Sequence, residues 1–127
     1  MDETFTILIT DPNLNVRQFL KREFTNAGYH ALYAGNHLQL FARLYETPSP
    51  HVIVLDPDIP YIQGIDIMKR IAGMTPAIPV ILHTYAQDYR NDPLIQMAQG
   101  VVEKNGDTQQ LLQTVTDILK QYYAEGI

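Results

Sequence analysis

The sequence predicts an α/β fold in which a parallel sheet is covered by helices on both faces. Short apolar runs alternate along the whole chain with segments whose apolar residues recur at helical spacing. The runs are continuously apolar, which is typical of strands that are buried on both sides. Regular alternation of the two kinds of segment favours strands that all run in the same direction, in a βαβαβαβαβα order.

The first two strand–helix units are predicted within residues 5–45. Residues 5–10 (FTILIT) form a β-rich run, and apolar residues at helical spacing follow from Val16 to Ala27, with Gly28 as the stop. Residues 29–33 (YHALY) indicate a weaker strand. Asn36 is expected to cap a second helix. The residues expected to face the core from that helix are Leu38, Phe41, Ala42 and Tyr45.

The third and fourth strands are the most apolar. Residues 51–55 follow a proline-rich turn, and residues 78–83 (IPVILH) follow a helix that carries Ile65, Met68 and Ile71 on one face. A polar loop is expected after the fourth strand. Together these segments predict the third strand, the third helix and the fourth strand.

The last part of the chain predicts two helices around a short strand. Asp92 and Pro93 suit the N-cap and first position of a short helix that ends by Gly100. Residues 101–103 form a very short strand. Asp107 then caps a helix with one apolar stripe. That stripe consists of Leu111, Leu112, Val115, Ile118, Leu119 and Tyr122.

Composition narrows the classes of function. A length of 127 residues predicts one domain, spanning residues 1–127. The chain has no cysteine, which excludes a disulfide scaffold, a thiol nucleophile and a thiolate metal site. Its net charge of -5 argues against direct binding of nucleic acid. No signal-peptide pattern and no apolar run of about 20 residues is present, so we expect a cytoplasmic protein outside the membrane.

Polar side chains stand where the predicted strands end. In open parallel sheets the site lies beyond the carboxyl ends of the strands, so we expect Asp11, Asp56, Asp58, Thr84 and Lys104 to come together. Two close carboxylates repel unless a cation neutralises them, and Mg²⁺ prefers such oxygen ligands. With a lysine and a hydroxyl, this set indicates phosphoryl transfer onto a carboxylate.

Four stretches resemble one known family. They are ILITD (residues 7–11), VLDPDIPYIQG (residues 54–64), IPVILHT (residues 78–84) and Lys104 before the last helix. The chain thereby resembles the receiver domain of bacterial two-component response regulators. The resemblance implies a flavodoxin-like (βα)5 fold, a doubly wound parallel sheet with strand order 2-1-3-4-5.

The resemblance also implies a role for each site residue. Asp56 corresponds to the phosphoacceptor, and Asp11 to one of the acids that hold Mg²⁺. The backbone carbonyl of Asp58 is a further metal ligand. Thr84 corresponds to the switch hydroxyl, and Lys104 to the lysine that pairs with the phosphoryl group.

Four positions depart from the family pattern, and one of them is Asn105 in place of the usual proline after Lys104. Pro12 replaces the second metal-site acid, so we expect weak binding of Mg²⁺. Tyr85 replaces a small residue after the switch hydroxyl, and Val101 replaces the switch aromatic. Two compensations are conceivable. The side chain of Asp58 or of Asn13 supplies the missing oxygen, and Tyr85 acts as the mobile aromatic.

The implied partners are a sensor histidine kinase or a phosphotransfer protein, and an output protein. Because the chain ends at Ile127, we expect the output to belong to a separate protein or domain. The resemblance also implies a homodimer through the face made by the fourth helix, the fifth strand and the fifth helix. This is the pattern of a signalling module and not of an enzyme.

Three alternatives stay open from the sequence. Asp56 and Asp58 also suit a solvated turn beside prolines. A pseudo-receiver would keep the fold but lose phosphorylation through Pro12. The string LDPDIP further resembles the signature of haloacid-dehalogenase-type phosphatases, with Asp58 as acid/base. His83 is expected to be a hydrogen-bonded strand residue, because the four histidines show no metal-ligand spacing.

Overall fold

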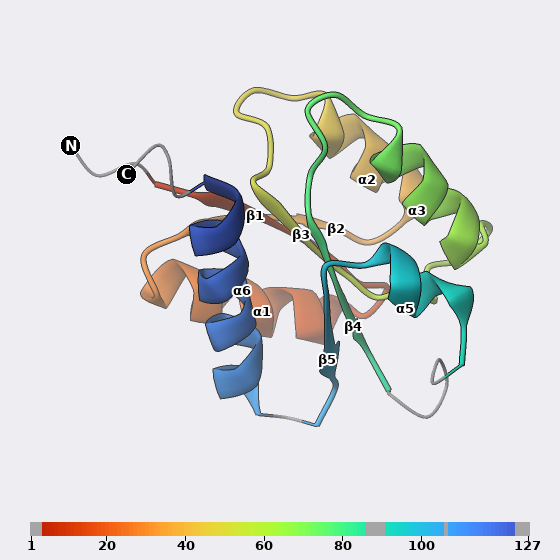
Figure 1. The fold of residues 1–127 in the computed structure, drawn as a ribbon. Helices are drawn as coiled ribbons and strands as arrows, with labels where there is room; N and C mark the ends of the chain where they lie inside the picture. Colours follow the sequence, from red (N-terminus) through yellow and green to blue (C-terminus); the bar gives the residue numbers. More distant parts are fainter. Residues whose placement is uncertain (1–3, 86–90, 106, 124–127) are drawn as a thin grey trace.

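The computed structural model describes residues 4–85, 91–105 and 107–123. Its sheet has five parallel strands in the order β2-β1-β3-β4-β5, which confirms the predicted topology (Figure 1). The strands are β1 (Thr6–Thr10), β2 (His30–Ala34), β3 (Val52–Leu55), β4 (Val80–Thr84) and β5 (Gly100–Glu103).

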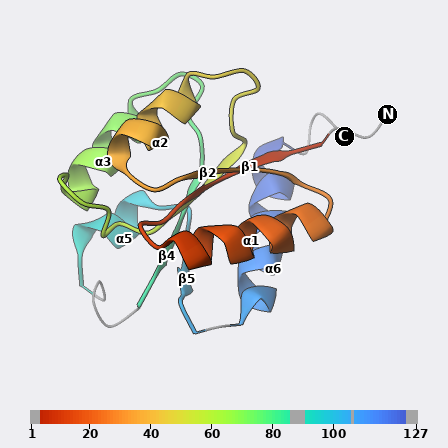
Figure 2. The same cartoon turned by 180° about the vertical axis from the view of Figure 1, so that it is seen from behind.

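Helices cover both faces of the sheet, as the continuously apolar strands predicted. They are α1 (Leu14–Asn26), α2 (His37–Leu44), α3 (Gly64–Ala72), α5 (Pro93–Met97) and α6 (Thr108–Tyr123). Helices α1 and α6 lie on one face, and α2, α3 and α5 lie on the other (Figures 1 and 2). Alternate strand residues feed two separate cores, with Ile7 and Ile9 on the α1/α6 side and Leu8 on the other.

Side-chain caps explain where three helices begin. Asn13 accepts hydrogen bonds from the backbone N–H groups of Asn15 and Val16, and Asn36 accepts one from Gln39. Asp92 caps α5 by accepting from Leu94, with Pro93 in the first turn. The caps predicted at Asn36 and Asp92 are therefore confirmed.

Gly28 follows the C-cap of α1 with a φ of 97°, in the left-handed region that favours glycine. The predicted stop of this helix is confirmed. Helix α5 is shorter than expected, since it ends at Met97 and Gly100 already begins β5. The polar loop expected after β4 falls largely on residues 86–90, and it lies outside the described residues, as does Ile127.

The predicted buried face of α2 was wrong except at Phe41. Leu38 and Tyr45 are 71% and 68% exposed, and Ala42 is exposed as well. Leu40, Phe41 and Leu44 face the core instead. Residues 38 and 45 are two helical turns apart, so they share one side of the helix, and that side is turned to solvent.

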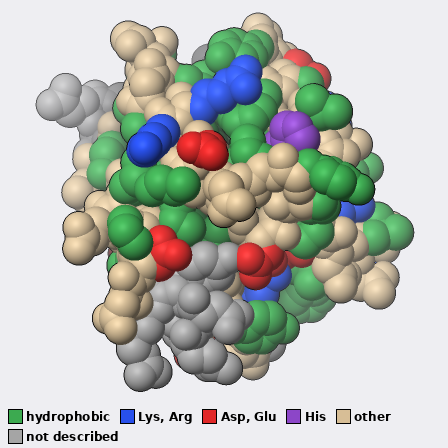
Figure 3. Space-filling view, turned by 90° about the vertical axis from the view of Figure 1, so that its right-hand side faces the viewer, with side chains coloured by type: hydrophobic (Ala, Val, Ile, Leu, Met, Phe, Trp, Pro, Cys, Tyr) green, Lys and Arg blue, Asp and Glu red, His purple; other side chains and the backbone are tan. Residues whose placement is uncertain are grey.

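On the side formed by α2, α3 and α5, neither basic nor acidic side chains form one large patch among the described residues. Hydrophobic, basic and acidic side chains are interspersed over this side (Figure 3). Among the described residues, no helix combines the length and the apolar character that crossing a lipid bilayer requires.

Candidate functional site

Strand pairing brings Asp11 and Asp56 together at the carboxyl edge of the sheet. Thr10 of β1 pairs with Leu55 of β3, so both acids follow directly after paired residues. The backbone N–H of Asp56 donates to the carbonyl of Thr10 over 2.8 Å. Asp11 is 2% exposed and Asp56 is 7% exposed. Two carboxylates that lie this close and this deep require a cation between them.

Lys104 supplies that cation. Its Nζ lies 2.7 Å from Oδ2 of Asp11 and 2.5 Å from Oδ2 of Asp56. The lysine follows β5, and its backbone N–H donates to the carbonyl of Thr84 over 2.8 Å. Burial alone would lower the pKa of Lys104, but its hydrogen bonds and charge interactions with Asp11 and Asp56 outweigh burial and raise that pKa. The predicted gathering of these residues is thus present.

The remaining carboxylate oxygens hold the loops. Oδ1 of Asp11 accepts a hydrogen bond from the backbone N–H of Asn13, and Oδ1 of Asp56 accepts one from Asp58, both over 2.9 Å. Oδ2 of Asp11 is buried, and its partner among the described residues is Nζ of Lys104 at 2.7 Å. An oxygen that is held by one ion pair alone can exchange that partner for another cation.

The oxygen donors present fit a divalent cation, with fewer charges than the family pattern. Asp11 and Asp56 offer buried carboxylates, whose Oδ2 atoms are paired with Lys104. Pro12 is exposed and has no carboxylate, and Asp58 is exposed. The described ranges contain no metal-binding group of three or more acidic, histidine or cysteine side chains, so a cation here would depend on two carboxylates and on backbone oxygen. The side-chain oxygen of Asn13 already accepts hydrogen bonds from the N-terminus of α1.

The switch positions surround this cluster. Thr84 ends β4 and is 2% exposed. Tyr85 is 54% exposed, and the centroid of its ring lies 6.0 Å from Nζ of Lys104. Val101 lies on β5 and is 38% exposed. Tyr85 thus lies at the limit of cation–π range from Lys104.

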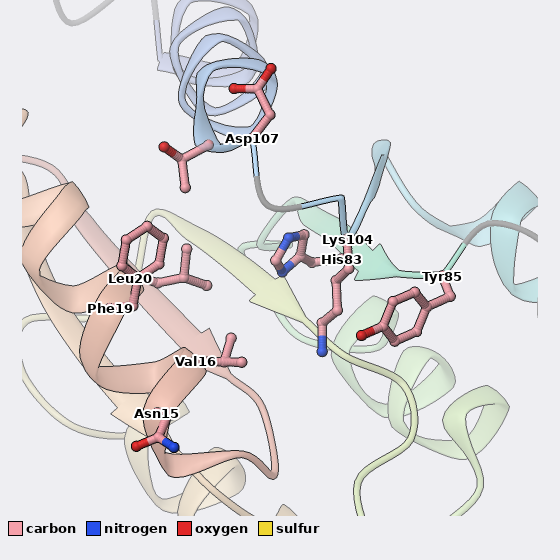
Figure 4. A pocket seen from close by; sticks show the side chains of 9 residues that line it. Asn15, Val16, Phe19, Leu20, His83, Tyr85, Lys104 and Asp107 are labelled. Carbon is pink, nitrogen blue, oxygen red and sulfur yellow. The ribbon is translucent and has the colours of Figure 1, made fainter.

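A cavity of about 310 Å³ opens beside Lys104, between α1, α6 and the end of β4 (Figure 4). Sequence reasoning did not find it, because its walls come from distant segments. Its lining residues are Asn15, Val16, Phe19, Leu20, His83, Tyr85, Lys104, Asp107 and Thr108.

His83 forms part of the cavity wall, and its imidazole has a lowered pKa. Burial, assisted by the charge of Lys104 and opposed by that of Asp56, lowers the pKa of His83 to about 4. Its Nδ1 is buried without a hydrogen-bond partner among the described residues. The prediction that His83 is a hydrogen-bonded histidine was therefore wrong for this nitrogen.

Arg17 is a second contact that sequence reasoning missed. Its Nη1 donates to the backbone carbonyl of Asp11 over 2.8 Å. The guanidinium lies against Gly35, where a β-carbon would stand 2.6 Å from Nη1. A larger residue at position 35 would have to displace this guanidinium, so a glycine directly after β2 was the available signal.

Comparison with known proteins agrees with the geometry. Residues 7–116 match the family model described as "Response regulator receiver domain". The chain is 35% identical over 78 residues to sporulation initiation phosphotransferase F of Bacillus subtilis, covering 61% of this chain and 62% of that protein. It is 32% identical over 98 residues to a protein-glutamate methylesterase/protein-glutamine glutaminase of Chromobacterium violaceum, covering 76% of this chain and 28% of that protein. The chain thus spans less than two thirds of either relative.

Solved structures give the same fold. Response regulator TrrA of Thermotoga maritima, in complex with Mg²⁺-BeF, has a TM-score of 0.83 and 26% identity, covering 91% of this chain and 100% of that one. The same regulator in complex with histidine kinase ThkA has a TM-score of 0.82, 26% identity and coverages of 91% and 99%. Chemotaxis response regulator CheY4 of Vibrio cholerae, at 20% identity, has a TM-score of 0.82 and coverages of 92% and 100%, and it supports the fold alone.

Proposed function

This chain belongs to the response regulator receiver domain family, and we propose that its Asp56 accepts a phosphoryl group from a phosphohistidine of a histidine kinase or phosphotransfer protein. The observation that carries the proposal is the pairing of the nearly buried Asp56 carboxylate with Lys104 at 2.5 Å. Turn acids that only solubilise a loop have no need of a lysine from a distant strand. A relative in this family, TrrA, is itself known in complex with a histidine kinase.

The transfer step needs little beyond charge and position. A carboxylate oxygen of Asp56 attacks phosphorus, the N–P bond of the phosphohistidine breaks, and the histidine nitrogen keeps the electron pair. Lys104 holds a phosphoryl oxygen by its ammonium charge, and Thr84 donates its hydroxyl to another. The backbone N–H of Asp58 holds Asp56 in place from the other side, at 2.9 Å.

Mg²⁺ is the metal that this site would hold. Receiver domains bind it at the phosphorylation site, and when bound it neutralises the oxygens of the transferred group. In this chain we assign it to the carboxylates of Asp11 and Asp56 and to the backbone carbonyl of Asp58. Because Pro12 removes one carboxylate, we propose that the ion binds weakly.

Receiver domains are signalling modules, and we propose that this one, over residues 1–127, works by a change in affinity for an output protein or domain. Phosphorylation shifts a two-state equilibrium only through its different contacts with the two states. A homodimer through α5, β5 and α6 is one form this output can take. The chain contains no cysteine, which suits the reducing conditions of the cytoplasm, where we propose that it works.

The test is phosphorylation by a small donor. The protein is incubated with acetyl phosphate and Mg²⁺, and its intact mass is measured. We expect one added phosphoryl group in the wild type and in Asp66→Ala, which changes an exposed acid on α3, and none in Asp56→Ala. A wild-type protein that gains no phosphoryl group would make the chain a pseudo-receiver.

A further inference from the structure

Tyr61 combines two features that oppose stability. Its φ is 70°, and it is the one residue other than glycine with a positive φ in the described part of the chain. Its side chain is 96% exposed, the highest value among the exposed large hydrophobic residues. A left-handed backbone is unfavourable for residues with a β-carbon, and glycine or asparagine occupies it more easily.

Nothing in the described part of the chain accounts for the position of this ring. An aromatic side chain stabilises a fold by the area that it buries, and this one buries almost none. No ring contact or hydrogen bond of the Tyr61 side chain is present among the described residues. Residues in strained backbone conformations cluster at binding and switch sites, where the surrounding structure holds them.

The location of Tyr61 relates it to the phosphoacceptor. It lies in the loop that joins β3, which ends at Leu55, to α3, which begins at Gly64. Asp56 opens this loop. Two further exposed side chains follow neighbouring strands of the same sheet edge, since Leu14 is 53% exposed after β1 and Tyr85 is 54% exposed after β4. Exposed apolar groups thus come from three of the loops at the acceptor edge.

We propose that Tyr61 is an anchor for the phosphohistidine-bearing protein and selects it as the donor. This inference rests on the proposed function. Asp56 is 7% exposed, so a donor histidine reaches it only if the donor protein covers the loops around it. Tyrosine is enriched among the few residues that dominate protein interfaces, because its ring is large and rigid. A small donor needs no such cover.

The test compares two donors on the same variants. The first donor is acetyl phosphate, and the second is a histidine kinase autophosphorylated with ATP, selected from a panel as the fastest donor to the wild type. In Tyr61→Asn we expect transfer from the kinase to slow at least tenfold and uptake from acetyl phosphate to change less than twofold. We expect Tyr61→Phe, which keeps the ring, to stay within threefold of the wild type with both donors.

A stability measurement separates this role from a structural one. Because asparagine relieves the left-handed strain, the midpoint of thermal unfolding of Tyr61→Asn should rise by about 3 °C while kinase transfer falls. Tyr45→Asn is the matched control, since Tyr45 is 68% exposed at the end of α2, away from the acceptor loops. It should leave transfer from both donors unchanged.

Each other outcome overturns the inference. Kinase transfer to Tyr61→Asn at the wild-type rate would show that the ring anchors nothing, and equal slowing with both donors would place its effect on the acceptor chemistry. If no kinase of the panel phosphorylates a wild-type protein that acetyl phosphate does phosphorylate, docking of such a donor here is excluded. Failure of acetyl phosphate itself contradicts the proposed function instead.

Discussion

Polar groups at the two edges of the sheet are used in opposite ways. At the carboxyl edge, the side chains of Asp11, Asp56 and Lys104 pair with one another, with Nζ to Oδ2 distances of 2.7 and 2.5 Å. Each carboxylate also accepts one backbone N–H through Oδ1, which leaves the pairing of Oδ2 with Lys104 as the contact that a phosphoryl group could redirect.

At the amino edge, other polar side chains form hydrogen bonds with the main chain. Nδ1 of His51 accepts a hydrogen bond from the backbone N–H of Thr6 over 2.9 Å, and the hydroxyl of Tyr123 donates to the carbonyl of His51 over 2.7 Å. The ring of Phe5 lies edge-on to His51, with centroids 5.0 Å apart. In another setting a histidine and a tyrosine side by side would suggest catalysis. Here they form hydrogen bonds that stabilise the amino edge of the sheet. The comparison teaches that the partner of a polar group, more than its type, marks a site.

The largest expected effect is at the carboxyl edge. Lys104→Met leaves two buried carboxylates without their cation and should lower the free energy of unfolding by about 3 to 4 kcal/mol at pH 7. Because the pKa of Lys104 is raised in the folded protein, its contribution is complete below the unfolded value near 10.4 and is lost as pH rises through the folded value. Urea unfolding between pH 7 and 11 measures the difference.

The control for this change is Lys120→Met, which alters an exposed lysine in the last turn of α6. It should change the free energy of unfolding by less than about 0.5 kcal/mol. Equal effects of the two substitutions would remove the contrast between a paired cluster and an ordinary surface charge.

The second effect concerns acid stability. His83 has a pKa of about 4 in the folded protein against 6.5 for an unperturbed histidine, so the unfolded chain binds more protons between these values. Stability should therefore fall as pH drops from 6.5 to 4, by up to about 3 kcal/mol. His83→Gln should lose this part of the pH dependence in urea unfolding at pH 7, 5.5 and 4.5. Parallel curves for the two proteins would contradict the prediction.

A third effect sharpens the contrast through the metal. Pro12→Asp adds a carboxylate next to Asp11 and should tighten Mg²⁺ binding about tenfold or more, which corresponds to about 1.4 kcal/mol. Magnesium titration followed by calorimetry gives the affinities. Asp58→Ala is measured in the same way. A weaker affinity for Mg²⁺ in that variant would show that the side chain of Asp58 replaces the acid missing at position 12. Equal affinities in the wild type and Pro12→Asp would show that this position does not contribute to the metal site.

The smallest effect lies at the amino edge. Tyr123→Phe removes the hydrogen bond to the carbonyl of His51 and should lower the free energy of unfolding by about 1 kcal/mol. Uptake of phosphate from acetyl phosphate should stay at the wild-type rate. A loss of phosphate uptake in this variant would contradict the view that the amino edge contributes to stability alone.

The order of strands and helices was predictable because each apolar run is short and ends at a turn residue. The face of α2 was not, because apolar residues occupy both sides of that helix and only packing selects Leu40 and Leu44 over Leu38 and Tyr45. The site acids were predictable from topology, since parallel strands deliver their carboxyl ends to one edge.

Other parts of the site depend on distances that periodicity does not encode. Arg17 and Asp11 are only six residues apart, but their hydrogen bond depends on how α1 lies against the end of β1. The burial of Nδ1 of His83 depends on packing by distant segments. The positive φ of Tyr61 is likewise contrary to the preference of its residue type. A residue that contradicts local preference is not visible in a pattern that is built on such preferences.

Gly35 has a consequence for how this protein tolerates change. It makes no contact with the carboxylates, yet any larger residue would meet the guanidinium of Arg17, 2.6 Å from the place of the new β-carbon. That guanidinium holds the carbonyl of Asp11. A substitution at position 35 would therefore act on the carbonyl of Asp11 through the displaced side chain of Arg17 in α1, and shortening Arg17 should remove the clash. Substitutions at Gly35 and Arg17 could thus change the position of the Asp11 backbone without replacing any side chain of the site.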